Sequence, residues 1–228
     1  MNVKPVLEKA IKNGQKALSE YDSKKILSEY KIPVTRESLA KTCEEAVQIA
    51  ESIGYPVVLK ACSHTLMHKS EGGFVEIFIK NKHDVKEAFE RITSKKNAGI
   101  DGILVQEMAS GQRELVLGFF RDPQFGPCVM AGLGGVMTEI LNDTSFRMAP
   151  LDEIEADDML SDLRSRKILE PFRGQKGVDK QALCRAIVSL GNIGLENEEI
   201  AEIDINPVII RPDGNIIAVD ALVVLNKD

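Results

Sequence analysis

The sequence predicts an α+β fold with two lobes, and two observations point to it. Helical and strand periods alternate along the 228 residues, which is typical of a chain that mixes both kinds of element. After Ala109 the pattern changes from helices alternating with strands to several strands in succession. We therefore expect a first lobe over residues 1–108 and a second over residues 109–228, with a ligand cleft between them.

The first lobe is expected to begin with one or two amphipathic helices between residues 4 and 31. They end before Pro33, because proline restricts the residue that precedes it. Thr42 and Glu45 have the spacing of a capping box, so a helix should begin there and stop at Gly54. The remaining elements are expected as strands at residues 57–62, 74–79 and 102–106 and a helix at about 83–96.

The second lobe is expected to contain mainly strands and to end in a hairpin. Asp122 and Pro123 predict one turn, and the glycine-rich stretch 132–135 predicts another. Strands are expected at residues 114–121, 127–131 and 136–141, helices near 152–169 and 179–192, and the final strands at 200–210 and 216–225.

Composition and motifs exclude several classes of protein. The formal net charge is −6, and no stripe of Lys and Arg suits the phosphates of a nucleic acid. No apolar run is long enough for a membrane span, and the N-terminus lacks the pattern of a signal peptide. The four cysteines have no paired spacing, which predicts a cytoplasmic protein. Neither a P-loop nor a Rossmann glycine motif is present.

The closing hairpin predicts a metal site. Asp204 and Asn206 are two residues apart and therefore share one face of their strand, while Ile203 and Ile205 point to the other. If the turn is centred on Asp213, then Asn206 faces Asp220, with Cβ atoms about 5 Å apart. Two carboxylates and an amide oxygen on one face suit Mg²⁺. A solvated hairpin face is the alternative.

Lys60 is the second candidate. It follows three apolar residues of the strand expected at 57–62, where Val58 and Cys62 share its face, so its ammonium lies along apolar surface. Such a lysine can hold a phosphate as a point charge. The alternative is a lysine that protects an edge strand from pairing.

Two further stretches contain groups that can bind a nucleoside or react with a phosphoryl group. The apolar strand 103–106 runs into Glu107 and Met108, where backbone groups can bind the edge of a base, and Glu107 or Glu114 can accept a hydrogen bond from an amine or a ribose hydroxyl. A core strand followed by a loop is the alternative. The loop from His64 to Gly73 joins two strands, and a neutral imidazole there can act as a nucleophile toward phosphorus. A surface histidine is the alternative.

Together these features resemble the ATP-grasp fold and, more narrowly, the β subunits of the ADP-forming (NDP-forming) acyl-CoA synthetases, typified by acetate–CoA ligase (ADP-forming). The resemblance extends from about residue 19 to residue 224. It depends on the stretches IGYPVVLKACS (53–63), HKSEGG (68–73), RDPQFGPCVMAGLGG (121–135), SFRMAPL (145–151) and AEIDINPVII (201–210).

The resemblance implies roles for residues of the first lobe and its exit. Lys60 would contact phosphate, Glu107 with the backbone at Met108 would form the adenine hinge, and Glu114 would hold the ribose. His68 matches the histidine that in this family is thought to carry a phosphoryl group.

The resemblance also implies a metal site and a nucleotide cleft in the second lobe. Asn206 and Asp220 would bind Mg²⁺, with Asp204 as a further candidate. The turn that contains Gly134 and Gly135 would line the cleft for ATP or ADP.

One departure from the family pattern lies beside the histidine motif. This chain reads Glu71-Gly72-Gly73-Phe74-Val75, where two glycines typically precede the valine.

The reaction implied by the resemblance is acyl-CoA + ADP + Pi ⇌ carboxylate + ATP + CoA. A CoA-binding α subunit would supply the acyl site and its own phosphohistidine, in an α2β2 heterotetramer, and His68 would pass the group to ADP. The alternatives are a succinate–CoA ligase β-like chain or another ATP-grasp carboxylate ligase subunit, and a nucleotide-binding regulatory module without catalysis.

Overall fold

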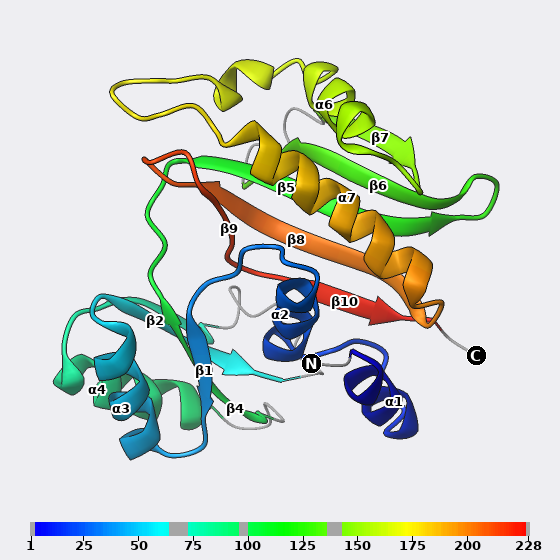
Figure 1. The fold of residues 1–228 in the computed structure, drawn as a ribbon. Coiled ribbons are helices and arrows are strands. Elements are labelled where there is room, and N and C mark those ends of the chain that lie inside the picture. The colour runs from blue at the N-terminus through cyan, green and yellow to red at the C-terminus, as the bar shows by residue number, and fades with distance from the viewer. Residues whose placement is uncertain (1–2, 64–72, 96–99, 136–142, 227–228) are drawn as a thin grey trace. The chain divides into compact units, whose positions relative to one another are not determined.

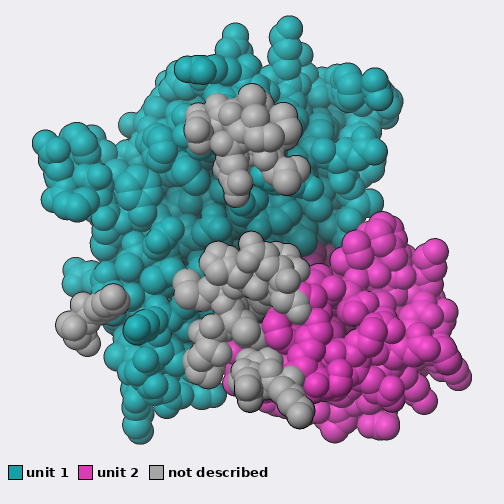
Figure 2. All heavy atoms as spheres, turned by 180° about the vertical axis from the view of Figure 1, so that it is seen from behind, with its two compact units in different colours: residues 1–18, 23–34, 109–228 teal, residues 19–22, 35–108 magenta. Residues whose placement is uncertain are grey.

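The computed structural model describes residues 3–63, 73–95, 100–135 and 143–226 (Figure 1). Its contacts divide the chain into two units, coloured separately in Figure 2. The smaller unit comprises residues 19–22 and 35–108, and the larger unit comprises residues 1–18, 23–34 and 109–228. The leading helices thus group with the second half of the chain, whereas the sequence analysis placed them in the first lobe. The functional division into lobes at residue 108 stays a prediction.

The smaller unit is a four-stranded antiparallel sheet with two helices on one face (Figure 1). Its strand order is β1-β4-β2-β3, and helices α3 and α4 contact the strands. The elements are β1 (Glu37–Ala40), α3 (Cys43–Ile53), β2 (Val57–Cys62), β3 (Val75–Ile79), α4 (Lys82–Thr93) and β4 (Gly102–Glu107).

Local sequence explains the helix ends of this unit. The Thr42 side chain accepts a hydrogen bond from the Glu45 backbone N–H at 3.2 Å, and the Glu45 carboxylate accepts one from the Thr42 N–H at 3.3 Å. This confirms the predicted capping box, which satisfies two N–H groups that the helix leaves unpaired. Gly54, with a φ of 92°, ends α3 as predicted. Strand β1 was not predicted, because its four residues show no clear period.

The larger unit is a six-stranded antiparallel sheet. Its order is β10-β8-β5-β6-β7, with β9 also paired to β8. Helices α6 and α7 lie against this sheet (Figure 1). The elements are α1 (Lys4–Lys12), α2 (Glu20–Glu29), β5 (Arg113–Asp122), β6 (Gly126–Leu133), β7 (Thr144–Met148), α6 (Glu153–Ser161), the 3-10 helix η1 (Arg166–Leu169), α7 (Lys180–Glu196), β8 (Ile200–Ile210), β9 (Ile216–Ala218) and β10 (Leu222–Leu225). The first turn of α2, residues 20–22, belongs to the smaller unit.

The core of the larger unit lies between its sheet, α7 and the leading helices. Phe119 of β5 is fully buried, and an added Cβ at Gly194 of α7 would come within 2.0 Å of its ring. The close packing of helix on sheet therefore requires glycine at that position. Leu7 and Ile26 bring α1 and α2 into the same cluster of buried side chains, which is why these helices group with the second half of the chain.

The structure of the second half differs from the prediction in three places. The helix expected near 152–169 ends at Ser161, with Asp162 in the C-cap position, and only a 3-10 turn follows. The strand expected at 216–225 is interrupted between Ala218 and Leu222. The structure adds strand β7, which was not predicted. The strand expected at 136–141 lies outside the described residues.

Within the described ranges, no helix is long and apolar enough to cross a membrane. None of the four cysteines, all of which lie in those ranges, forms a disulfide.

Candidate functional site

The closing hairpin has the register that the sequence predicts. Strand β9 pairs with β8 so that Val208 lies opposite Ala218, and β10 continues the same register farther along β8. The three residues between β9 and β10 belong to neither strand. Asp220 is the middle one, and the register places it opposite Asn206.

A bulge in β8 adjoins this pair. The register between β5 and β8 shifts between Leu115 and Leu117, so that Asn206 and Pro207 both lie opposite Val116. Pro207, which has no N–H to donate, lies at this bulge, although β8 is in the interior of the sheet. A bulge turns a side chain out of the regular alternation and is frequent beside functional sites.

The two faces of β8 have the predicted character. Ile203 and Ile205 are 1% and 0% exposed and belong to the core, whereas Asp204 is only partly buried. Burial, together with the charges of Glu202 and Asp220, raises the pKa of Asp204 to about 6. Negative charge thus accumulates on the face opposite the core.

The donor set on this face fits a magnesium ion. Mg²⁺ needs only one or two carboxylates, because phosphate and water complete its octahedron. Asp204, Asp220 and the amide oxygen of Asn206 supply oxygen ligands only, and a cation would relieve the repulsion that raises the pKa of Asp204. Within the described ranges, no cluster of three or more His, Cys, Asp or Glu side chains could hold a metal, so any ion here depends on an amide, water or phosphate as well.

The glycine turn after β6 lies against this site. The Gly134 N–H donates to the Glu114 carbonyl at 2.8 Å, and the Gly135 N–H donates to the Asn206 Oδ1 at 3.4 Å. A Cβ at Gly135, where φ is 67°, would lie 2.0 Å from the Glu114 Oε2, and one at Gly134 would meet the backbone of Leu115 at 2.5 Å. The larger unit thus brings Glu114, Gly134, Gly135 and Asn206 together.

Helix α2 holds the segment that carries Asp220, and the sequence analysis did not find this. The Lys24 Nζ donates to the Val219 carbonyl at 3.0 Å, and the Ser23 Oγ accepts a hydrogen bond from the Val223 N–H at 3.1 Å. Lys24 is 1% exposed. A signal was present, because Ser23 and Lys24 lie four and three residues before Leu27, on the stripe of the helix that faces the core.

In the smaller unit, Lys60 forms a buried ion pair. Strand β2 lies between β4 and β3, so Lys60 is not on an edge and the edge-protection alternative is wrong. Its Nζ lies 2.8 Å from the Oε1 of Glu20, and the two side chains are 7% and 1% exposed. A lysine is seldom buried without a function or a counter-charge, and the sequence analysis did not find Glu20.

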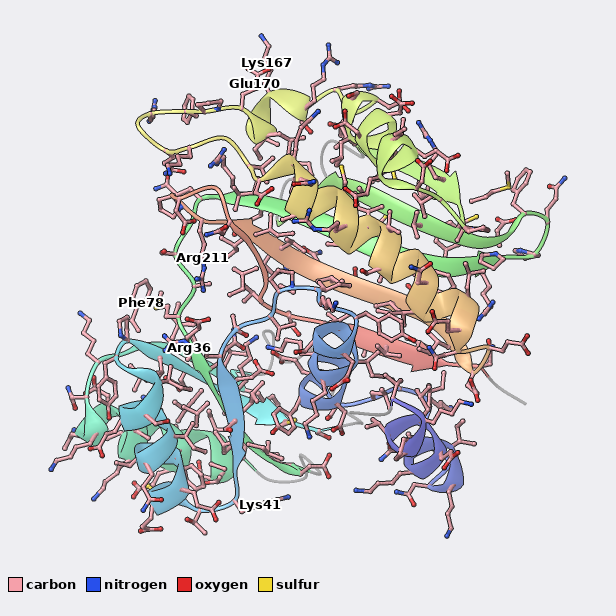
Figure 3. All side chains as sticks on the ribbon, viewed as in Figure 1. Arg36, Lys41, Phe78, Lys167, Glu170 and Arg211 are labelled. Carbon is pink, nitrogen blue, oxygen red and sulfur yellow. The ribbon has the colours of Figure 1, made fainter. Side chains whose placement is uncertain are left out.

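Glu107 also contacts its own chain. Its carboxylate accepts hydrogen bonds from the backbone N–H of Arg36 at 2.9 Å and from the Arg36 Nε at 3.2 Å; Arg36 is labelled in Figure 3. The backbone N–H of Glu107 donates to the Arg36 carbonyl and that of Met108 to the Pro56 carbonyl. These two N–H groups are therefore engaged within the chain, and the contact of Glu107 and Met108 with a base stays a prediction. An adenine hinge here is limited to carbonyl groups and to N–H groups after Met108.

The candidate nucleophile His68 lies outside the described residues. The described chain resumes at Gly73. The Phe74 carbonyl accepts a hydrogen bond from the Ala61 N–H at 2.8 Å, and the Lys95 Nζ lies 4.9 Å from the centre of the Phe74 ring. Phe74 is the residue that departs from the family pattern, and its backbone is hydrogen-bonded to β2.

The fold and the residues of the two units define a class of protein. The family model of the ATP-grasp domain matches residues 9–225. The chain belongs to the ATP-grasp family.

Relatives within that class can be named. The chain is 44% identical to the β subunit of acetate–CoA ligase [ADP-forming] I from Pyrococcus furiosus, over 96% of each chain. It is 38% identical to acetate–CoA ligase [ADP-forming] I from Archaeoglobus fulgidus, of which it spans 33%.

One similar solved structure covers nearly all of the chain. The dinucleotide-forming acetyl-coenzyme A synthetase 1 of Ca. Korarchaeum cryptofilum, in complex with coenzyme A and Ca-AMPCP, is 46% identical. The TM-score is 0.93, and the match covers 99% of this chain and 100% of that one.

Proposed function

We propose that this chain is the nucleotide-binding β subunit of an ADP-forming acetyl-CoA synthetase. One observation carries the proposal: the chain matches the Pyrococcus β subunit over 96% of both sequences. The corresponding match to a succinate–CoA ligase β subunit of Haloarcula marismortui is 28% identical and spans 55% of that protein. The acetate type is therefore favoured over the succinate type.

The proposal assigns a role in nucleotide binding to four residues. Lys60 contacts a phosphate, Glu114 accepts hydrogen bonds from the ribose, and the chain at Glu107 and Met108 contacts the adenine. A related structure contains Mg-AMPPCP, with a phosphohistidine segment that points towards its nucleotide-binding site. This supports a phosphoryl group that travels to the nucleotide on a histidine.

The metal ligands are proposed to be Asn206 and Asp220, with Asp204 beside them. When bound, Mg²⁺ would neutralise the charge on the phosphate oxygens during transfer. Lys24 and Ser23 hold the backbone on either side of Asp220, and Gly135 holds the Asn206 oxygen. These contacts orient the ligands before the nucleotide arrives.

The transfer itself is proposed to pass through His68. A partner α subunit binds acyl-CoA and phosphate and forms an acyl phosphate with release of CoA. The phosphoryl group then moves to a histidine of that subunit, and the carboxylate leaves. The His68 imidazole then attacks the phosphorus, the bond to the partner's histidine breaks, and an oxygen of the ADP β-phosphate takes the group to give ATP. Such a relay lets the acyl site and the nucleotide site remain apart. We propose an α2β2 assembly in the cytoplasm.

Phosphate labelling tests this function. The chain, reconstituted with an α subunit of an acetate–CoA ligase (ADP-forming), is incubated with ATP labelled in the γ-phosphate and Mg²⁺. We expect label on this chain that is lost in acid and stable in base, as for a phosphohistidine. His68→Asn should abolish it.

The matched control is His83→Asn. His83 lies on α4 and is exposed, 3.8 Å from the Glu87 carboxylate, and its loss should leave the labelling unchanged. Nucleotide binding without any label on the wild-type chain would favour the regulatory module instead.

A further inference from the structure

The Lys60–Glu20 ion pair is the strongest feature that the proposed function leaves unexplained. Lys60 is 6% exposed and Glu20 is 3% exposed as whole residues, and their charged atoms are 2.8 Å apart. A buried pair of charges is weak evidence for stability, because desolvation offsets the attraction. A reason other than stability is therefore needed.

Glu20 occupies a fixed place. It is the first residue of α2. The preceding residue, Ser19, accepts a hydrogen bond from the Asp22 N–H at 3.2 Å, and its own hydroxyl donates to the Asp22 carboxylate at 2.9 Å. This capping arrangement fixes the start of the helix, and with it the backbone of Glu20.

The position of the Lys60 ammonium, by contrast, has to be fixed by a contact with another residue. Its backbone is fixed in an interior strand, opposite Leu104 on β4 and Val75 on β3. Its side chain has four flexible carbons and ends in an ammonium with three donors. The carboxylate of Glu20 engages one donor and so defines where the ammonium lies.

We propose that Glu20 is a positioning residue for nucleotide binding: it holds the Lys60 ammonium at the point where that group meets a phosphate. The inference rests on the proposed function, since it takes Lys60 as the phosphate-contacting lysine. Glu20 acts only through Lys60. The two residues should therefore behave as one unit in binding, whereas a purely structural Glu20 would not.

A double-mutant cycle on the full chain tests this. Affinity for Mg-ADP is measured by calorimetry for the wild type, Glu20→Gln, Lys60→Met and the double variant. Each single change should weaken binding on the order of tenfold, and the double variant should bind no worse than Lys60→Met, because the two effects are coupled. The control is Glu76→Gln, which removes an equal charge from the sheet that contains Lys60. Glu76 pairs there with Arg91 at 3.0 Å. It should bind as the wild type does.

The outcomes are distinct. Unchanged affinity in Glu20→Gln, or effects that add in the double variant, would overturn the inference but leave the proposed function standing. Unchanged affinity in Lys60→Met would remove Lys60 from the proposed site and the inference with it. If Glu20→Gln does not fold, Glu20→Asp retains the charge and shifts it by one methylene, and wild-type affinity in that variant would refute positioning.

Discussion

The backbone N–H of Gly135 lies 3.4 Å from the side-chain oxygen of Asn206, to which it donates a hydrogen bond. The contact joins the glycine turn after β6 to the bulge in β8, two places that are 71 residues apart in the sequence. It fixes the orientation of the Asn206 amide, since only the oxygen can accept. The oxygen proposed as a metal ligand is therefore oriented by the turn itself.

The first prediction concerns this turn. Gly135→Ala should weaken Mg-ADP binding, because the new Cβ would lie 2.0 Å from the Glu114 Oε2 and displace that carboxylate. Because φ is positive at this position, the alanine should also lower the free energy of unfolding by about 1–2 kcal/mol. Gly126→Ala is the matched control, since its φ is 76° and nothing lies within 4 Å of the added atom. Equal ADP affinities in the two variants, measured by calorimetry, would exclude Gly135 from the site.

The second prediction concerns the metal. Asp220→Ala should weaken the Mg²⁺-dependent part of ADP binding by about tenfold or more, since even residues that only support metal ligands contribute that much. ADP binding in the presence of a chelator should not change. Mn²⁺ binding, followed by electron paramagnetic resonance, gives a readout that is independent of the nucleotide.

The control for the metal prediction is Asp213→Asn at the turn of the same hairpin. Among the residues that the structure describes, Asp213 accepts hydrogen bonds only within the turn, from Asn215, and its change should leave Mn²⁺ binding intact. Full Mn²⁺ affinity in Asp220→Ala would remove the hairpin from the metal site.

The third prediction concerns the buried lysine of α2. Lys24→Met should lower the free energy of unfolding by about 1–3 kcal/mol, because the Val219 carbonyl loses a charged donor. It should also weaken Mg²⁺-dependent ADP binding, since Asp220 follows Val219 directly. Lys25→Met, one residue along on a more exposed side of the helix, is the comparison. Chemical denaturation measures the stability of the two variants, and calorimetry measures their ADP binding. A change in stability with no change in binding would make Lys24 a structural residue only.

The fourth prediction concerns pH. Burial by itself would raise the pKa of Asp143, but hydrogen bonds from Ser165 and Arg164 outweigh it and lower the pKa below its ordinary value. The charged form is therefore favoured in the folded state, and the resulting stability is present above the unfolded pKa of about 4 and lost as the pH falls through the folded value. Asp143→Asn should cost about 1–3 kcal/mol at pH 7.

The difference between Asp143→Asn and the wild type should shrink as the pH falls below about 4. Urea unfolding at pH 7 and at lower pH measures it. Asp162→Asn, which breaks an exposed ion pair with Arg147, should change stability by less than about 1 kcal/mol. A difference for Asp143→Asn that stayed constant with pH would show that the charge of this carboxylate does not matter.

Part of this structure could be predicted from the sequence, because it depends on interactions between nearby residues. The capping box of Thr42 and Glu45 is confirmed because its partners lie within one helical turn. The hairpin register could be predicted because the turn and the alternation of Ile203 and Ile205 leave only one face for the core, and the structure confirms it. Each of these depends on residues close together in the chain.

The rest depends on distant residues. Glu20 reaches Lys60 across 40 positions and Lys24 reaches Val219 across 195. Spacing in the sequence cannot reveal such partners, although charged residues on the apolar stripe of a helix indicate that partners must exist. Likewise, the contacts of Arg36 with Glu107, 71 residues away, could not be foreseen.

The alternation along β8 has a consequence for how this chain can vary. Adding or removing one residue before Asp204 would invert the strand, send Ile203 and Ile205 toward water and drive the carboxylate into the core. Substitutions that keep the apolar and polar positions would do far less harm. Natural variants of this chain should therefore differ in the residues of the strand while keeping its length, with insertions confined to the exposed tip at Asp213.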